Sequence, residues 1–159
     1  MKAATIHQIK QELNTLDQSE LINTCLRLAK YKKDSKELLS YLLFQAADED
    51  LYIKEIKEEI TALFEEGLGS SVYYIKKGLR KIIKLIDKYL RFSGNKETEL
   101  EVRIFLCQEI KKNKIPIQRS TVLQNMYAGQ LKKINAALSK LHEDLQYDYE
   151  EAILEISNT

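Results

Sequence analysis

Residues 70–93, SSVYYIKKGLRKIIKLIDKYLRFS, show the clearest periodicity in this 159-residue chain. Such spacing, with apolar residues three and four apart, is typical of an amphipathic helix that packs one side against a core. A Gly-Leu-Gly turn precedes the stretch and Gly94 follows it, and Ser70 or Ser71 is the expected N-cap. On a helix of 3.6 residues per turn, the apolar positions fall within about 100° of arc: Ile75, Leu79, Ile82, Ile83, Ile86 and Leu90.

The opposite side of this predicted helix is basic. Its lysines and arginines lie between roughly 140° and 240° from Ile75, facing away from the apolar stripe. A positive stripe is the electrostatic footprint expected of a surface for nucleic acid or an acidic partner, although any exposed amphipathic helix also places lysine on its solvent side. Tyrosines at the start of the helix suit an interface because the ring is apolar and its tip polar. The candidate partner-binding residues are Lys77, Arg80, Lys81, Lys84, Lys88, Arg91, Tyr73 and Tyr74.

The preceding stretch has the opposite charge. Residues 48–66 hold eight acids and two lysines, whereas residues 70–93 hold seven Lys or Arg and one acid. Five of these acids lie opposite the apolar row Ile56, Ile60, Leu63 and Phe64: Glu55, Glu58, Glu59, Glu65 and Glu66. If the two helices form a hairpin, their outer faces give a dipolar surface that could orient a partner or a second copy.

Capping patterns divide the rest of the chain into helices. Asp17 with Glu20 and Asp34 with Glu37 match the capping box, and Thr121 with Gln124 is a possible third start. The apolar rows predict that the first two helices bury one side, including Ile6, Ile9, Leu21 and Leu28. The expected helices span residues 5–15, 18–32, 34–43, 48–66, 70–93, 96–113 and 121–156, the last with a break near 145. The helix at 96–113 is apolar around much of its circumference, which predicts a central position.

We therefore expect an all-α fold of seven to eight antiparallel helices, joined by short turns into a single domain over residues 1–159. Lys30-Tyr31 with Lys36-Glu37 is echoed by Lys88-Tyr89 with Lys96-Glu97. The echo favours a helical repeat, so the arrangement is either an irregular helical bundle or a short α-solenoid. In overall character the chain is similar to small HEAT- and armadillo-type scaffolds, although it carries no motif of those families.

A further apolar seam runs from Tyr127 to Leu145, at alternating spacings of four and three. At about two and a half heptads it is short for a coiled coil, so it either packs on the chain's own core or forms a homodimer. Cys25 and Cys107 both lie among apolar neighbours, which predicts buried, reduced thiols.

Patterns of catalytic or metal-binding residues are missing from the sequence. The acidic block from His142 to Glu155 lacks the spacing of an EF-hand loop or a zinc site, and the turn at 67–71 lacks the Lys-Ser/Thr of a phosphate loop. No G-x-S-x-G or activated cysteine is present. We expect no cofactor, no metal and no enzymatic activity.

Charge and hydropathy bear on the type of partner and on the location of the protein in the cell. The net charge is +1 and only five of 25 basic residues are arginine, which gives no overall attraction to nucleic acid. No apolar run reaches the roughly 20 residues of a membrane helix, and the N-terminus lacks the apolar core of a signal peptide. We therefore expect a cytoplasmic protein without membrane contact.

The favoured function is a non-enzymatic protein-interaction or scaffold module. It would contact a protein partner through the charged outer faces of helices 48–66 and 70–93, as a monomer or as a homodimer through the 127–145 seam. The alternative is a nucleic-acid-binding protein that uses the basic helix 70–93. The third is an enzyme with no recognisable motif.

Overall fold

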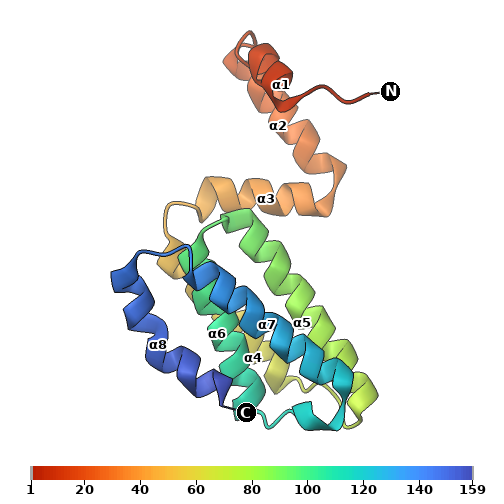
Figure 1. Cartoon of the computed structure of the whole chain (residues 1–159). Coiled ribbons are helices and arrows are strands. Elements are labelled where there is room, and N and C mark those ends of the chain that lie inside the picture. The colour runs from red at the N-terminus through yellow and green to blue at the C-terminus, as the bar shows by residue number, and fades with distance from the viewer. Residues whose placement is uncertain (1, 159) are drawn as a thin grey trace. The chain divides into compact units, whose positions relative to one another are not determined.

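The computed structural model describes residues 2–158, and within them the chain forms eight α-helices and one 3₁₀ helix (Figure 1). The predicted all-α fold is confirmed.

The chain divides into two compact units, Met1–Phe44 and Gln45–Thr159. A single domain over residues 1–159 stays a prediction. The first unit holds α1 (Ile6–Leu13), α2 (Gln18–Tyr31) and α3 (Lys33–Phe44); the second holds α4 (Glu49–Glu65), α5 (Val72–Ser93), α6 (Lys96–Lys112), η1 (Ile117–Arg119), α7 (Thr121–Leu138) and α8 (Glu143–Ser157).

Most predicted helix ends are confirmed because the capping side chains form the expected hydrogen bonds. Asp17 and Glu20 make a reciprocal capping box at α2. Ser71 accepts from the backbone N–H of the third helical residue of α5. Gly94 ends α5 in the left-handed conformation, with φ of 67°, and Asn95 then caps α6. These local bonds satisfy backbone groups that a helix leaves unpaired at its ends.

Three predicted boundaries are wrong. Asp34 does not cap α3: Lys32 takes an extended conformation and the helix begins at once at Lys33, so Asp34 lies in its first turn. Thr121 is the first residue of α7, and Ser120 takes the N-cap position without a side-chain hydrogen bond. The break in the last segment falls between α7 and α8, earlier than 145, and His142 caps α8 there.

In the second unit, α6 is the central helix, as its apolar circumference predicts. It packs against α4, α5, α7 and α8, so this unit is a bundle around one helix. Leu100, Leu106 and Cys107 are fully buried on α6, and they meet the apolar stripes of the surrounding helices. Burial of such side chains contributes about 1.5–3 kcal/mol each.

The seam from Tyr127 to Leu145 is divided between α7 and α8. Tyr127 and Ile134 are buried, and the Tyr127 hydroxyl donates to the backbone carbonyl of Ile156 at 2.6 Å. Leu131, Leu138, Leu141 and Leu145 are half-buried. Of the two alternatives for the seam, these contacts correspond to packing on the chain's own core. A homodimer through the seam stays a prediction.

The first unit buries far less than its apolar rows predict. Among its described residues, Tyr41 is the single buried apolar side chain, and nothing in α1 or α2 is buried. Ile6 and Leu28 are 82% and 61% exposed. Cys25 is exposed while Cys107 is buried, so the prediction of a buried thiol is wrong for Cys25. The periodicity is present, and Leu21 and Ala29 are half-buried, but no side chain of α2 is fully buried.

None of the helices within residues 2–158 combines the length and the apolar character needed to cross a membrane.

Candidate functional site

The basic side of α5 faces solvent because the other side of the helix is buried. Ile75, Leu79 and Ile86 are at most 8% exposed, and this fixes the rotation of the helix. Of the predicted contact residues, Lys88 is half-buried and the others are exposed: Lys77, Arg80, Lys81, Lys84, Arg91, Tyr73 and Tyr74. The structure thus brings these residues onto one helix face, which we call the basic face.

Four of these cations have no internal partner. Lys77, Arg80, Lys81 and Lys84 form no hydrogen bond or ion pair with any residue from 2 to 158. Lys88 differs, because its Nζ lies 5.3 Å from the centre of the Tyr89 ring. Their charge is therefore not neutralised by the acids of the neighbouring helix α4.

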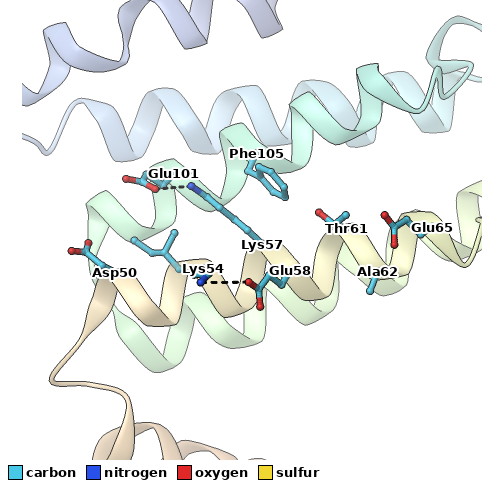
Figure 2. A pocket seen from close by; sticks show the side chains of 10 residues that line it. Asp50, Lys54, Lys57, Glu58, Thr61, Ala62, Glu65, Glu101 and Phe105 are labelled. Carbon is cyan, nitrogen blue, oxygen red and sulfur yellow. Dashed lines mark hydrogen bonds and ion pairs between the residues drawn. The ribbon is translucent and has the colours of Figure 1, made fainter.

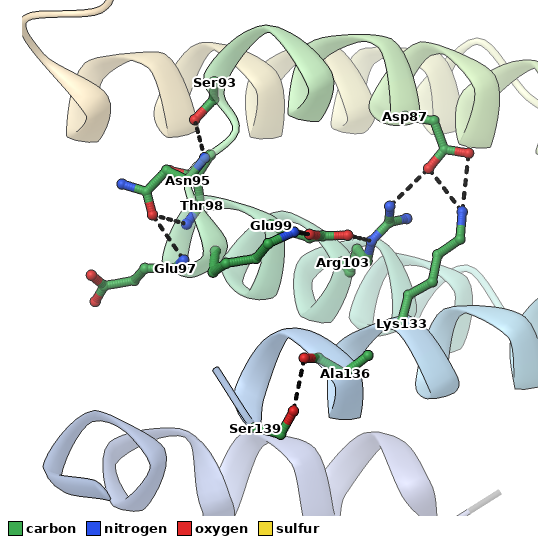
Figure 3. Close-up of polar contacts among 11 residues, drawn as sticks. Asp87, Ser93, Asn95, Glu97, Thr98, Glu99, Arg103, Lys133, Ala136 and Ser139 are labelled. Atoms are coloured by element: carbon green, nitrogen blue, oxygen red, sulfur yellow. Dashed lines mark hydrogen bonds and ion pairs between the residues drawn. The ribbon is translucent and has the colours of Figure 1, made fainter. Parts of the chain in front are cut away.

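Asp87, the one acidic residue of α5, points toward Arg103 and Lys133 and is neutralised by them (Figure 3). Asp87 accepts from Arg103 Nη2 at 2.8 Å and from Lys133 Nζ at 3.0 Å. Burial alone would raise the pKa of Asp87, but the hydrogen bonds from Arg103 and Lys133 outweigh it and hold the pKa below its ordinary value. The basic face therefore carries charge of one sign.

Arg103 is the centre of this internal network. It is 4% exposed and also binds Glu99 at 3.1 Å and Gln130 at 2.8 Å, so it joins α5, α6 and α7. Burial opposes ionisation of Glu99, yet Lys96 and Arg103 together keep its pKa below the ordinary value. A buried guanidinium with all its partners in place fixes the orientation of the three helices.

A groove opens beside the basic face, where the turn after α4 folds back onto α5. Its volume is about 510 Å³, and its apolar lining comes from Leu63, Leu68 and Ile82. Lys77 and Lys81 line the same groove. Two unpaired cations thus stand next to an apolar surface, an arrangement that suits an apolar side chain flanked by acids. Glu66, Gly67, Gly69, Tyr74 and Gly78 complete the lining.

Glycines make this groove possible. Gly69 has φ of +99°, and a Cβ there would lie 2.5 Å from the Cβ of Tyr74. At Gly78, within α5, a Cβ would lie 2.9 Å from Leu68 Cδ2. Gly69 is required by its left-handed backbone and its contact with Tyr74, and the missing side chain at Gly78 lets Leu68 pack closely on the helix. Sequence reasoning identified the turn but missed the groove; the signal available was a glycine inside an otherwise strong amphipathic helix.

Tyr73 and Tyr74 are 65% and 57% exposed, and their rings meet edge to face at 5.3 Å. This contact limits the freedom of both side chains. Two partly ordered aromatic rings at the start of the basic face lose less conformational entropy on binding than free side chains do.

The outer face of α4 is acidic, as predicted, but part of it is engaged. Glu59 accepts from the Tyr89 hydroxyl at 2.9 Å, and Glu55 accepts from Gln45 at 2.6 Å. Glu65 and Glu66 are exposed near the end of the helix. The basic face of α5 therefore carries more unpaired charge than the acidic face of α4.

A second groove, of about 590 Å³, lies between α4 and α6 (Figure 2). Lys57 reaches across it to Glu101 at 2.8 Å, with its Nζ 5.7 Å from the centre of the Phe105 ring. Lys54 and Glu58, also in its lining, are 3.9 Å apart. Since its lysines are already paired with carboxylates, this groove offers no free cation to a ligand.

Two potentially reactive groups, Cys107 and Tyr149, are held in their protonated forms. Burial raises the pKa of Cys107 to about 12, which keeps it a neutral thiol. Burial and the carboxylates of Glu101 and Glu97 raise the pKa of Tyr149, whose hydroxyl donates to both. Among residues 2–158, no three His, Cys, Asp or Glu side chains gather as metal ligands.

Comparisons with protein-family models, with curated proteins and with solved structures gave no match to this chain.

Proposed function

We propose that the chain is a non-enzymatic protein-interaction module that binds a partner through the charged outer faces of α4 and α5. One observation carries this proposal: α5 exposes four unpaired cations, and two of them, Lys77 and Lys81, line an apolar groove. The partner segment that complements this surface combines acidic side chains with an apolar one. Exposed tyrosines at the start of α5 extend the contact. We place the protein in the cytoplasm.

Both parts of the surface support a protein partner over nucleic acid. A phosphate backbone would use the cations but leave the apolar groove empty, whereas a peptide can use both. The net charge of +1 provides no long-range attraction to a polyanion. The nucleic-acid alternative shares the basic face and is decided by the same variants.

The test replaces Lys77, Arg80, Lys81 and Lys84 with Glu and measures capture of partner proteins identified by mass spectrometry. Exposed ion pairs contribute about 0.2–1 kcal/mol each, so four losses weaken binding by roughly fourfold to nearly a thousandfold. The melting temperature should not change, because the four side chains have no internal partner. Undiminished capture by the folded variant would rule out this surface.

A control variant separates a local effect from a change in net charge. Replacing Lys77 and Lys81 changes the charge by the same amount as replacing Lys132 and Lys140, which are also exposed but lie outside α5. Only the first pair should weaken capture. A filter-binding titration with duplex DNA addresses the alternative: binding that falls steeply with salt and is lost in the first pair would favour nucleic acid.

A further inference from the structure

The outer side of α8 is acidic and carries exposed apolar side chains. No lysine or arginine follows Lys140 in the sequence. Tyr147 and Leu154 are 74% and 63% exposed and lie two turns apart on one side of the helix. At 3.6 residues per turn, Glu150 lies about 60° to one side of Tyr147 and Glu151 about 40° to the other. We call the following exposed residues the α8 face: Glu143, Tyr147, Asp148, Glu150, Glu151 and Leu154.

The carboxylates of the α8 face have no internal partner. Among residues 2–158, none forms an ion pair or a hydrogen bond with the side chains of Glu143, Asp148, Glu150 and Glu151. The cations of the basic face do not neutralise them within one chain, because α5 and α8 lie on opposite sides of α6 and α7 in the second unit (Figure 1). Each chain therefore exposes one unpaired positive helix face and one unpaired negative helix face.

The acidic outer side of α4 is a poorer complement to the basic face. Glu58 lies 3.9 Å from Lys54, and Glu59 accepts from the Tyr89 hydroxyl. Among the described residues of α4, Leu51 is the single large apolar side chain that is exposed. The α8 face combines four unpaired acids with two large apolar side chains, which is the combination that the basic face and its groove require.

The basic face matches the α8 face in length as well as in charge. Lys77 and Lys84 are seven residues apart, as are Tyr147 and Leu154, so each pair spans about 10 Å along its helix. When α8 lies along α5, its apolar side chains meet the groove and its acids face the cations. Glu66 also lines the groove, but Lys77 and Lys81 outnumber it. Such complementary charge selects one partner surface over others.

We propose that the α8 face of one chain binds the basic face and groove of α5 in a second copy of this chain. The inference rests on the proposed function, since it assigns a second copy as an occupant of the same α5 surface. The two faces differ, so the contact is head-to-tail and extends to rings or longer chains as the concentration rises. At any one α5, the α8 face of another copy and a different partner protein exclude each other.

Sedimentation velocity of the purified full chain tests the proposal. The sedimentation coefficient should rise with concentration above that of the 18.5 kDa monomer. Raising the salt from about 0.1 to about 1 M shortens the Debye length from about 10 to about 3 Å and should restore the monomer value. Lys77→Glu with Lys81→Glu, and separately Glu150→Lys with Glu151→Lys, should each weaken self-association by about tenfold. A wild type that is monomeric at all concentrations, or self-association that either pair leaves unchanged, overturns the proposal.

A mixture of the two double variants locates the contact. The α5 variant keeps its α8 face and the α8 variant keeps its basic face, so together they should associate although neither does so alone. Lys132→Glu with Lys140→Glu, an equal change of charge at exposed positions outside α5, should self-associate like the wild type. A mixture that stays monomeric while both variants keep the wild-type melting temperature, or a control that loses association to the same degree, overturns the contact.

The same variants separate this inference from the proposed function. Capture of a partner protein that is lost in Lys77→Glu with Lys81→Glu, combined with self-association that Glu150→Lys with Glu151→Lys leaves unchanged, overturns the contact between copies alone. An α5 variant that alters neither capture nor self-association overturns both.

Discussion

Replacing Arg103 with Met tests how the internal network supports the basic face. The change removes a guanidinium that is 4% exposed and leaves Asp87, Glu99 and Gln130 without it. Removing one partner of a fully buried ion pair costs about 3–5 kcal/mol. Here the two carboxylates are 34% and 19% exposed and keep Lys133 and Lys96, so the expected loss is smaller, about 2–3 kcal/mol.

Urea unfolding followed by circular dichroism measures this loss. For a chain of this length, 2–3 kcal/mol corresponds to a fall in melting temperature of roughly 5–10 °C. Lys133→Met is the matched control: its amine is 44% exposed and Arg103 remains on Asp87, so its cost should stay within about 1 kcal/mol. A stability for Arg103→Met within about 0.5 kcal/mol of the wild type would refute the structural role of the network.

The same variant should change the response to acid. The ordinary pKa values of Asp87 and Glu99 are 3.8 and 4.5, and both are lowered in the folded chain. The unfolded state therefore binds more protons in this range, so the contribution is complete above about pH 4.5 and is lost as the pH falls through the lowered folded values. Without Arg103 that acid-dependent loss should shrink. An unchanged pH dependence would contradict the assigned contacts.

Three further changes have definite expectations. Gly69→Ala should cost about 1–3 kcal/mol in urea unfolding, because a side chain at φ of +99° meets Tyr74. Leu79→Ala, at a fully buried position on α5, should cost about 2–5 kcal/mol by the same measurement; a value below 1 would show that this side of α5 is not packed. In a Cys25→Ser chain, the remaining thiol of Cys107 should resist a thiol reagent until denaturant is added, and rapid native labelling would contradict its burial.

Local signals in the sequence were sufficient for most helix boundaries. The bonds that end a helix join residues two to four positions apart, so Asp17-Glu20 and Gly94-Asn95 could be identified without tertiary information. The N-cap predicted at Asp34 is wrong because the α2–α3 junction uses an extended residue, Lys32, in place of a capping turn. Which of two adjacent residues starts a helix depends on such backbone detail.

Burial was predictable only where a second surface exists. The apolar stripes of α5 and α2 have similar periodicity, yet that of α5 is buried in the bundle and that of α2 is exposed. Periodicity states which side of a helix prefers to be covered, and it does not state what covers it. The apolar neighbours of Cys25 therefore predict burial, whereas the described residues leave this side chain exposed.

The sequence predicts one part of the candidate site, the basic face, but not the groove, because the groove depends on tertiary contacts. The basic face follows from helical spacing alone. The groove depends on the turn packing against Gly78, and the single sign of the face depends on Arg103 neutralising Asp87 from another helix. Both contacts join residues distant in the helical pattern, so spacing within α5 could not reveal them.

Site-specific photo-cross-linking tests partner contact at α5 most directly. A photoreactive amino acid is placed at Tyr74, which is 57% exposed beside the groove, or at Tyr147, which is 74% exposed on α8. We predict that Tyr74 cross-links the captured partner protein and that Tyr147 does not. Cross-linking of that partner at Tyr147 alone, or equally at both positions, would contradict the assignment of the binding surface to α5.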